Sequence, residues 1–433
     1  MKRAKPIATA LAIAAAASMI LTGCGGSTSP TSPGTSAGPQ SLTVWHNGTG
    51  DKAQAYWAGV VTDFQAQYPN VTVNVQVVQN EDFDGKLQAA MQAGTTPDVF
   101  LQRGGGKLSD MIAANQVLDI TNLIDPTVKQ QMGGSFGTAT IGGKIYAMPM
   151  SLTPEGFWYN QDLFDKAGIT TNPTDMAGLN AAVTALKGSG VDAISVGAKD
   201  AWPAAHWYYQ FALRECSKDT IQNMPNDKQL ADPCWLKAFQ DLADFNATKP
   251  FNNGYLTTVA QQGAGSSAGL LANGKAAMEL MGAWEPGVVG DLTPDKQPLA
   301  SLRFFGFPSV DGGQGDQTAM MAGSDGYSCS ASAPQPACTD FLNFIGQQKY
   351  SEGYATAYTT IPANTAAMGV VTDPSLKGAV DALSKAAYIV LWFDTSLGQD
   401  VGNAVNAAVV ALLAGQVDPA GAVAQMQQAV KGG

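Results

Sequence analysis

The sequence predicts an α/β fold built from two lobes, each a mainly parallel sheet flanked by helices. Strand-like and helix-like segments alternate after residue 40, which is the pattern of parallel sheets covered by helices. About 390 residues remain in this part, more than a single hydrophobic core usually supports. No apolar run there is long enough to cross a bilayer. We therefore expect two cores outside the membrane.

The first 23 residues have the organisation of a signal peptide. Basic residues at positions 2, 3 and 5 precede an apolar stretch over 7–21 that ends in small residues. The run Leu21-Thr22-Gly23-Cys24 resembles a bacterial lipobox, in which the cysteine is diacylated. We expect a lipid anchor on Cys24. The alternative is an ordinary signal peptide with a cysteine there by chance.

Residues 24–40 are predicted to be a tether. Positions 25–38 are almost entirely Gly, Ser, Thr and Pro. Such a segment cannot bury apolar surface and stays flexible. The folded part is expected to begin near Ser41, at the extracellular face of the cell membrane.

The first series of elements runs from residue 42 to residue 101. Alternating or continuous apolar residues predict strands over 42–45, 71–78 and 98–101. Apolar residues at helical spacing predict helices over 53–68 and 82–93. This order favours a parallel sheet.

A second series begins near Gly156 and leads into a helical C-terminal third, without internal repeats. Strands are predicted over 156–160, 193–196, 276–281 and 302–307. Helices are predicted over 162–168, 174–186, most of 203–246, 377–387, 398–413 and 419–431. These elements supply the second lobe.

The composition restricts the class of partner. Only 14% of the residues are charged, and the formal net charge is −11. An acidic chain repels phosphate backbones and anionic surfaces, so nucleic acid is not an expected partner. This balance favours an uncharged ligand.

The cysteines predict two disulfides. With Cys24 assigned to lipid, four cysteines remain, and an even number in an exported protein indicates disulfide bonds. Three pairings are possible. We predict Cys216–Cys234 and Cys329–Cys338, because each pair is local and falls within one predicted module. No zinc or other metal site is predicted, since the chain has no Cys-x-x-Cys and only two histidines.

Several runs resemble those of the family 1 extracellular solute-binding proteins of sugar ABC importers, in a lipoprotein form typical of Gram-positive bacteria. The runs are Leu42-Thr43-Val44-Trp45-His46, 64–73, Gly94-Thr95-Thr96-Pro97-Asp98, Gly156-Phe157-Trp158-Tyr159-Asn160, 162–164, 274–278, Gly282-Ala283-Trp284-Glu285 and Gly323-Ser324-Asp325-Gly326-Tyr327. Their order covers nearly all of the chain past the tether.

The resemblance implies a periplasmic-binding-protein-like fold with hinge strands and a ligand in the interlobe cleft. Lobe one would hold 41–152 and 317–361, and lobe two would hold 153–316 and 362–433. Closure about the hinge is the expected motion. The implied partners are a sugar and the membrane permease subunits of an ABC importer. We expect a monomer without cofactor or enzymatic activity.

Sugar recognition filters the candidate site residues. A pyranose packs its C–H face on an aromatic ring, and its hydroxyls need fixed donors and acceptors. In α/β sheets such groups follow the carboxyl ends of strands. The ligand-binding candidates are His46, Asn47, Gln102, Arg103, Glu155, Trp202, Trp207, Trp284, Glu285, Asp325, Trp392 and Asp394. Of Trp202 and Trp207, we expect one to lie in the cleft. Alternatives are a core role for each aromatic residue and a surface or turn role for Arg103 and Asp325.

Two other classes of protein were weighed. A glycoside hydrolase needs only two carboxylates, so composition does not exclude one. A Gly-x-Ser-x-Gly match at 265–269 lacks the strand that a nucleophile elbow requires. The second alternative is a surface adhesin without a ligand.

The many tryptophans favour a di- or oligosaccharide as the ligand, and the resemblance leans toward xylo-oligosaccharide.

Overall fold

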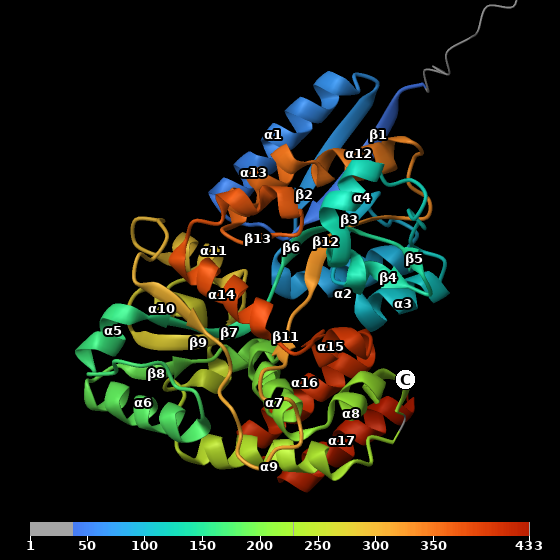
Figure 1. Cartoon of the computed structure of the whole chain (residues 1–433). Helices are drawn as coiled ribbons and strands as arrows, with labels where there is room; N and C mark the ends of the chain where they lie inside the picture. Colours follow the sequence, from blue (N-terminus) through green and yellow to red (C-terminus); the bar gives the residue numbers. More distant parts are fainter. Residues whose placement is uncertain (1–37, 228, 433) are drawn as a thin grey trace, which may run out of the picture. The chain divides into compact units, whose positions relative to one another are not determined.

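The structure is a computed structural model that describes residues 38–227 and 229–432 (Figure 1). The predicted signal peptide over 1–23, the lipidated Cys24 and the tether up to residue 37 lie outside the described residues. Pro39–Gly433 forms one compact unit by its internal contacts. Within the described residues, no helix combines the length and the apolar character needed to span a bilayer.

A six-stranded sheet is built mainly from the first part of the chain. Its strand order is β13-β6-β12-β3-β1-β2. The strands are β1 (Gln40–His46), β2 (Val71–Val77), β3 (Val99–Gln102), β6 (Met148–Leu152), β12 (Ser324–Cys329) and β13 (Ile361–Pro362). The helices and small elements of this lobe are α1 (Asp51–Gln67), α2 (Asn80–Gln92), α3 (Gly105–Ala113), α4 (Pro126–Met132), η1 (Gly133–Ala139), β4 (Thr140–Ile141), β5 (Lys144–Ile145), α12 (Ala337–Gly346), α13 (Gln348–Tyr358) and η5 (Thr365–Val370).

A four-stranded sheet forms the second lobe, with the order β10-β7-β9-β8. Its strands are β7 (Glu155–Asn160), β8 (Asp192–Ser195), β9 (Ala276–Gly282) and β10 (Leu302–Phe305). Its helices are α5 (Gln161–Lys166), α6 (Met176–Gly188), α7 (Trp202–Glu215), α8 (Lys218–Asn223), α9 (Pro233–Ala247), α10 (Ser267–Ala272), α11 (Glu285–Leu292), α14 (Pro374–Lys385), α15 (Phe393–Ser396), α16 (Gln399–Leu413) and α17 (Pro419–Gly432). Smaller elements are η2 (Ala198–Asp200), η3 (Met224–Asn226), η4 (Tyr255–Thr257) and the pair β11 (Met320–Met321) with β14 (Ile389–Val390).

Local sequence explains where several helices begin and which face they bury. In α1, the buried Ala53, Trp57, Val60 and Phe64 recur at three- or four-residue spacing and form one apolar stripe. Among the helices that begin at an Asp-Pro pair, in which the Asp side chain accepts backbone N–H bonds and the Pro occupies the first helical position, α17 follows Asp418 and three others share the pattern. These are α4, α9 and α14.

The expectation of mainly parallel sheets is wrong for both lobes. In the first sheet β1 pairs in parallel with β2 and β3, whereas β12 runs antiparallel to β3 and to β6. In the second sheet β8 and β9 are parallel, and β7 runs antiparallel to both of its neighbours. The cause is the connection between the lobes. A strand that begins at the side of a sheet where other strands end must run antiparallel to those strands.

Each sheet has its own hydrophobic core. Trp57, Phe64, Phe100 and Phe341 are buried together in lobe one. A larger aromatic cluster fills lobe two, with Phe157, Trp207, Tyr208, Trp235 and Phe307 among its members. Full burial of one such side chain stabilises the fold by roughly 1.5–3 kcal/mol, so each lobe is held by its own apolar contacts.

The chain crosses between the two sheets at three places in the described residues. It leaves lobe one between β6 and β7, returns between β11 and β12, and leaves again between η5 and α14. Figure 1 shows the first two crossings near the middle of the molecule. We propose boundaries of 39–152 with 324–371 for lobe one, and 153–323 with 372–432 for lobe two. These differ from the expected ones because β11 pairs with β14 and η5 packs on α13.

The structure confirms both predicted disulfide pairings. Cys216 at the end of α7 bonds to Cys234 in α9, across a separation of 18 residues. Cys329 at the end of β12 bonds to Cys338 in α12, across 9 residues. Each bond therefore fastens a helix within one lobe.

The longer disulfide loop gives a stability prediction. Replacing Cys216 and Cys234 by Ser should lower the free energy of unfolding by about 3 kcal/mol, since the longer loop restricts the unfolded chain more. Urea unfolding of the soluble protein measures this. The matched variant without Cys329 and Cys338 should lose about half a kcal/mol less. A larger loss in the second variant would contradict this explanation.

Candidate functional site

Two sheet edges that carry polar and aromatic residues face each other across the lobe interface. β1 and β3 end, and β12 begins, at the edge of lobe one. β7 begins, and β9 ends, at the edge of lobe two, where Glu155 pairs with Gly282. The crossings join these edges directly, because Thr153 N–H donates to Gly323 O over 3.0 Å.

The lobes also touch at the rim of this interface. Gln262 Nε2 donates to Glu81 Oε2 over 2.9 Å, and Lys296 Nζ lies 3.1 Å from Asp51 Oδ2. Both contacts are exposed and join a loop of lobe two to a helix of lobe one. The facing edges are therefore enclosed between the crossings and these rim contacts.

Four rings of lobe two form a cluster that we call the aromatic wall: Trp202, His206, Trp284 and Trp392. The Trp202 ring centre lies 6.1 Å from that of Trp284, which lies 5.5 Å from that of Trp392. His206 stacks on Trp392 at 5.7 Å and contacts Trp202 at 5.1 Å. Trp202 begins α7, Trp284 precedes α11, and Trp392 precedes α15. Residues far apart in sequence thus meet at one edge.

The carboxylate of Glu155 lies behind the wall. Oε1 lies 2.5 Å from His206 Nδ1, and Oε2 accepts hydrogen bonds from Gln210 Nε2 at 2.8 Å and Trp392 Nε1 at 3.1 Å. The side chain is almost completely buried. The expectation that Glu155 accepts a ligand hydroxyl is therefore not supported, because its oxygens are engaged by the protein.

Trp202 and Trp284 differ from Trp392 in their exposure and hydrogen bonding. Both are half-buried, whereas Trp392 is buried and donates to Glu155. The indole N–H groups of Trp202 and Trp284 have no hydrogen-bond partner among the described residues. These two residues therefore retain partly exposed rings, while their buried N–H groups lack an acceptor from the protein.

The facing edge of lobe one is polar and charged. Arg103 Nη2 donates to Asn80 Oδ1 over 2.9 Å, and Asn47 Nδ2 donates to the same oxygen over 3.1 Å. Arg103 also lies 3.6 Å from Asp84 and 3.9 Å from Asp325. Donors and acceptors from four elements are thus held in one network.

This network shifts the pKa values of its acids. Burial alone would raise the pKa of Asp84, but Arg103 and Lys107 lower it to about 2. Burial raises the pKa of Asp325, and the positive charge of Arg103 only partly opposes this. Asp84 therefore remains ionised and holds the two basic side chains in place.

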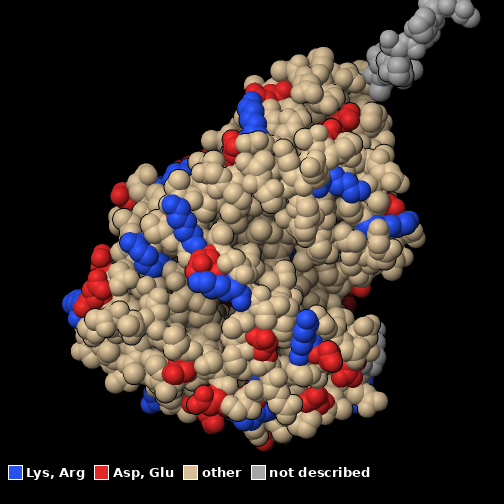
Figure 2. Space-filling model, in the orientation of Figure 1, with Lys and Arg blue, Asp and Glu red and all other residues tan. Residues whose placement is uncertain are grey.

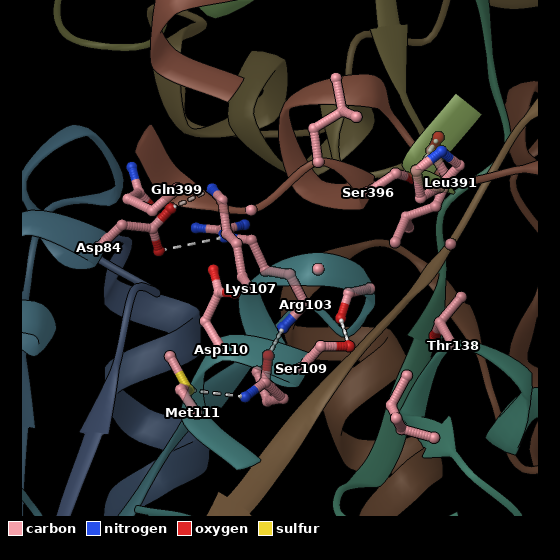
Figure 3. Close-up of a pocket in the computed structure, with 18 of the residues that line it drawn as sticks. Asp84, Arg103, Lys107, Ser109, Asp110, Met111, Thr138, Leu391, Ser396 and Gln399 are labelled. Carbon is pink, nitrogen blue, oxygen red and sulfur yellow. Dashed lines mark hydrogen bonds and ion pairs between the residues drawn. The ribbon is translucent and has the colours of Figure 1, made fainter. Parts of the chain in front are cut away.

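A cavity of roughly 1070 Å³ lies beside this network, between α2, α3 and η1 of lobe one and the 389–401 segment of lobe two (Figure 3). Figure 3 shows the Asp84 side chain beside Lys107 and Arg103, with Gln399 close by. Its lining contains amide, hydroxyl and charged groups together with Leu, Ile and Met side chains, and no aromatic ring. Leu391 lines it, and the next residue is Trp392, so the cavity adjoins the aromatic wall.

Four other predicted residues lie in different surroundings than expected. His46 is buried, stacks on Trp57 and accepts from the Gly48 N–H, and burial lowers its pKa to about 4. Trp207 is completely buried among Phe157, Phe245, Phe251 and Phe307, and is a core residue. The structure therefore gives neither ring a ligand-contacting position.

Gln102 is engaged by its own loop, and Asp394 by a neighbouring helix. Gln102 Oε1 accepts from the N–H groups of Arg103 and Gly104, both at 2.9 Å, although the residue also lines the cavity. Asp394 Oδ2 accepts from Asn406 Nδ2 at 3.1 Å. Both side chains shape the segments that carry Arg103 and Trp392.

Sequence reasoning left out four residues that the structure brings to the site: Asn80, Asp84, Lys107 and His206. Asn80 and Asp84 lie on α2, which follows β2, so the rule of polar residues beyond strand ends could have found them. His206 follows Trp202 by one helical turn on α7. Lys107 gives no distinctive signal in the sequence.

Glu285 is completely buried and not available to a ligand as expected. It lies beside Glu279 of β9, which is also buried. Burial raises the pKa of Glu279 to about 8, and burial together with Glu279 raises that of Glu285. The two carboxyl groups lie on either side of Trp284 in the chain, and they hold at least one proton at neutral pH.

Figure 2 shows that charges of both signs are scattered over one face of the molecule, most of which is uncharged. Within the described residues, no cluster of three or more His, Cys, Asp or Glu could hold a metal ion. The arrangement offers stacking rings and hydrogen-bonding groups on opposite sides of one interface.

Comparisons with known proteins agree with this arrangement. The profile of bacterial extracellular solute-binding proteins matches residues 47–352. A binding protein of Brucella abortus is 26% identical over 207 residues, which is 46% of this chain and 49% of that protein. The chain thus spans about half the length of this relative. The melibiose/raffinose/stachyose-binding protein MelE of Bacillus subtilis is 22% identical over 337 residues, covering 75% of this chain and 74% of that protein.

A solved structure confirms the fold class. It comes from work on xylan utilization by the thermophilic bacterium Caldanaerobius polysaccharolyticus. It superposes with a TM-score of 0.82 at 25% identity, covering 90% of this chain and 99% of that one. The predicted two-lobe periplasmic-binding-protein-like fold is therefore confirmed.

The buried carboxyl pair predicts a pH dependence of stability. The folded protein keeps its proton on Glu279 up to about pH 8, above the ordinary pKa of 4.5, so stability is lost as pH rises between these values. Glu279→Gln should reduce this loss, because only the buried Glu285 then contributes to it, and should be more stable than the wild type near pH 9 by at least about 1 kcal/mol. Urea unfolding at several pH values tests this, with Glu352→Gln on α13 as the control. Equal slopes for Glu279→Gln and the wild type would contradict it.

Proposed function

Because the chain belongs to the family of bacterial extracellular solute-binding proteins, we propose that it captures a sugar outside the cell and delivers it to an ABC importer. The proposed ligand is a neutral di- or oligosaccharide. The proposed partners are this sugar and membrane permease subunits encoded elsewhere.

The aromatic wall opposite the polar edge is the observation that carries this proposal. Sugar rings need an aromatic face for their C–H groups and fixed partners for their hydroxyls. Trp202 and Trp284 offer half-buried rings for the C–H face. Across the interface, Arg103, Asn47 and Asp325 supply donors and acceptors. The two lobes would thus contact opposite sides of one ligand.

The size and lining of the adjoining cavity favour more than one sugar ring. Its volume of roughly 1070 Å³ is at the upper end for small-molecule sites. MelE is named for melibiose, raffinose and stachyose, and the Caldanaerobius structure comes from work on xylan utilization. These relatives support an oligosaccharide, and we retain xylo-oligosaccharide as the first compound to test.

A binding role fits the site better than glycoside hydrolysis. A glycosidase needs two carboxyl groups on either side of the scissile bond. Glu279 and Glu285 are almost completely buried, and Glu155 is engaged by three protein groups. Asp84 and Asp325 are both tied to Arg103. The burial and the protein contacts of these acidic residues support a structural role for them within the site.

The proposed location is the outer face of the cell membrane. It rests on the predicted lipid anchor at Cys24 and on the extracellular family to which the chain belongs. A captured sugar would then be released close to the importer.

Ligand binding should depend on Trp284. In a panel of mono- and oligosaccharides, one class should raise the thermal unfolding temperature of the soluble protein by a few degrees, without product on overnight incubation. Trp284→Ala should weaken binding of that sugar at least tenfold by calorimetry, since the stacking face is lost, while Trp284→Phe should retain part of it. Leu123→Ala, at an exposed position, is the control. Cleavage of any sugar would instead support a glycoside hydrolase. No response to any sugar would favour an adhesin.

Transport gives a separate prediction. Deleting the gene should abolish uptake of the bound sugar at low external concentration, measured with labelled sugar. A Cys24→Ser gene should restore less uptake than the wild-type gene, because the protein would lose its anchor. Unchanged uptake in the deletion strain would contradict the importer role.

A further inference from the structure

We propose that Glu155 is a positioning residue for the sugar site, whose buried carboxylate fixes Trp392 and His206 and thereby the shape of the aromatic wall. This inference rests on the proposed function, in which the wall contacts the sugar. Glu155 acts through these rings and not by contacting the sugar itself.

The contacts of the carboxylate carry the proposal. One oxygen lies 2.5 Å from His206 Nδ1, and the other accepts from Gln210 and from Trp392. His206 and Gln210 are one turn apart on α7, whereas Trp392 precedes α15. Glu155 therefore joins two segments that are about 180 residues apart in the sequence. Within the wall, it orients the two rings that stack on each other.

The burial of this carboxylate argues for a specific role. An ionised carboxyl group is costly to remove from water unless it is paired and hydrogen-bonded. A well-packed apolar residue would often serve stability equally well at such a position. The group is instead retained where three side chains converge on it, two of which belong to the wall.

Glu155 also connects the wall to the first crossing. It is the first residue of β7, and Thr153, two residues earlier, donates from both N–H and Oγ1 to Gly323 O of the second crossing. A Cβ atom on Gly323 would lie 2.7 Å from Leu391 and 3.2 Å from the Trp392 ring. A side chain there would crowd both residues, so the ring packs closely on the crossing backbone. The orientation of Trp392 is thus set at the junction of both lobes.

The first experiment compares Glu155→Ala with Glu155→Gln. The alanine variant should bind the sugar at least tenfold more weakly by calorimetry, because Trp392 and Gln210 lose their acceptor. The glutamine variant keeps an acceptor oxygen and should stay within about threefold of the wild type. Glu352→Ala is the control. Wild-type affinity of Glu155→Ala would overturn the proposal.

A double-mutant cycle separates positioning from general stability. Trp392→Phe keeps a ring but removes the N–H donor to Glu155, and should weaken binding at least threefold. If Glu155 acts through Trp392, the losses in Glu155→Ala and Trp392→Phe should be clearly less than additive in the double variant. Additive losses would overturn the proposal, as would unchanged affinity of Trp392→Phe, which also decides the matter if Glu155→Ala does not fold.

A readout without ligand keeps this inference distinct from the proposed function. The near-ultraviolet circular dichroism and tryptophan fluorescence of the free protein should change in Glu155→Ala and not in Glu352→Ala. Failure of the wild type to bind any sugar would defeat the proposed function alone. Unchanged spectra in a folded Glu155→Ala would defeat the positioning role alone.

Discussion

A chain that builds two sheets from interleaved segments has to cross between them, and a crossing that joins a strand of each sheet places the end of one strand beside the start of the other. Here Leu152 ends β6 and Glu155 begins β7, while Ser324 begins β12. This constraint explains the antiparallel partners in both sheets. It also brings the ends of strands to one interface, together with the polar and aromatic residues that follow them in the sequence. The position of the site thus follows from the connectivity of the two lobes.

The protein handles buried charge in three different ways near this interface. Asp84 is paired with Arg103 and Lys107, so it remains ionised. Glu155 accepts hydrogen bonds from Gln210 and Trp392 and lies beside His206. Glu279 has only another acid and a hydroxyl beside it, and therefore keeps its proton. The first two arrangements hold side chains in defined positions, whereas the third leaves a neutral group in the core.

Much of the fold was predictable because it depends on local patterns. The apolar run 276–281 became β9, and the nearby cysteines paired as expected. Strand direction was not predictable, since it depends on where the chain crosses. For the site, the rule of strand ends placed Arg103 and Asp325 at the same edge. It failed for His46 and Glu285, because their burial is decided by packing against residues far away in the sequence.

The two rim contacts have a consequence for how often the interface opens. Gln262 with Glu81 and Lys296 with Asp51 are exposed polar pairs, each contributing roughly 0.2–1 kcal/mol. Together they favour the observed arrangement by at most about 30-fold, which adds to the apolar packing of Leu152 and Ile361 against lobe two. The lysine pair weakens further in salt. The contribution of the rim contacts to the equilibrium between lobe arrangements therefore falls as the ionic strength rises.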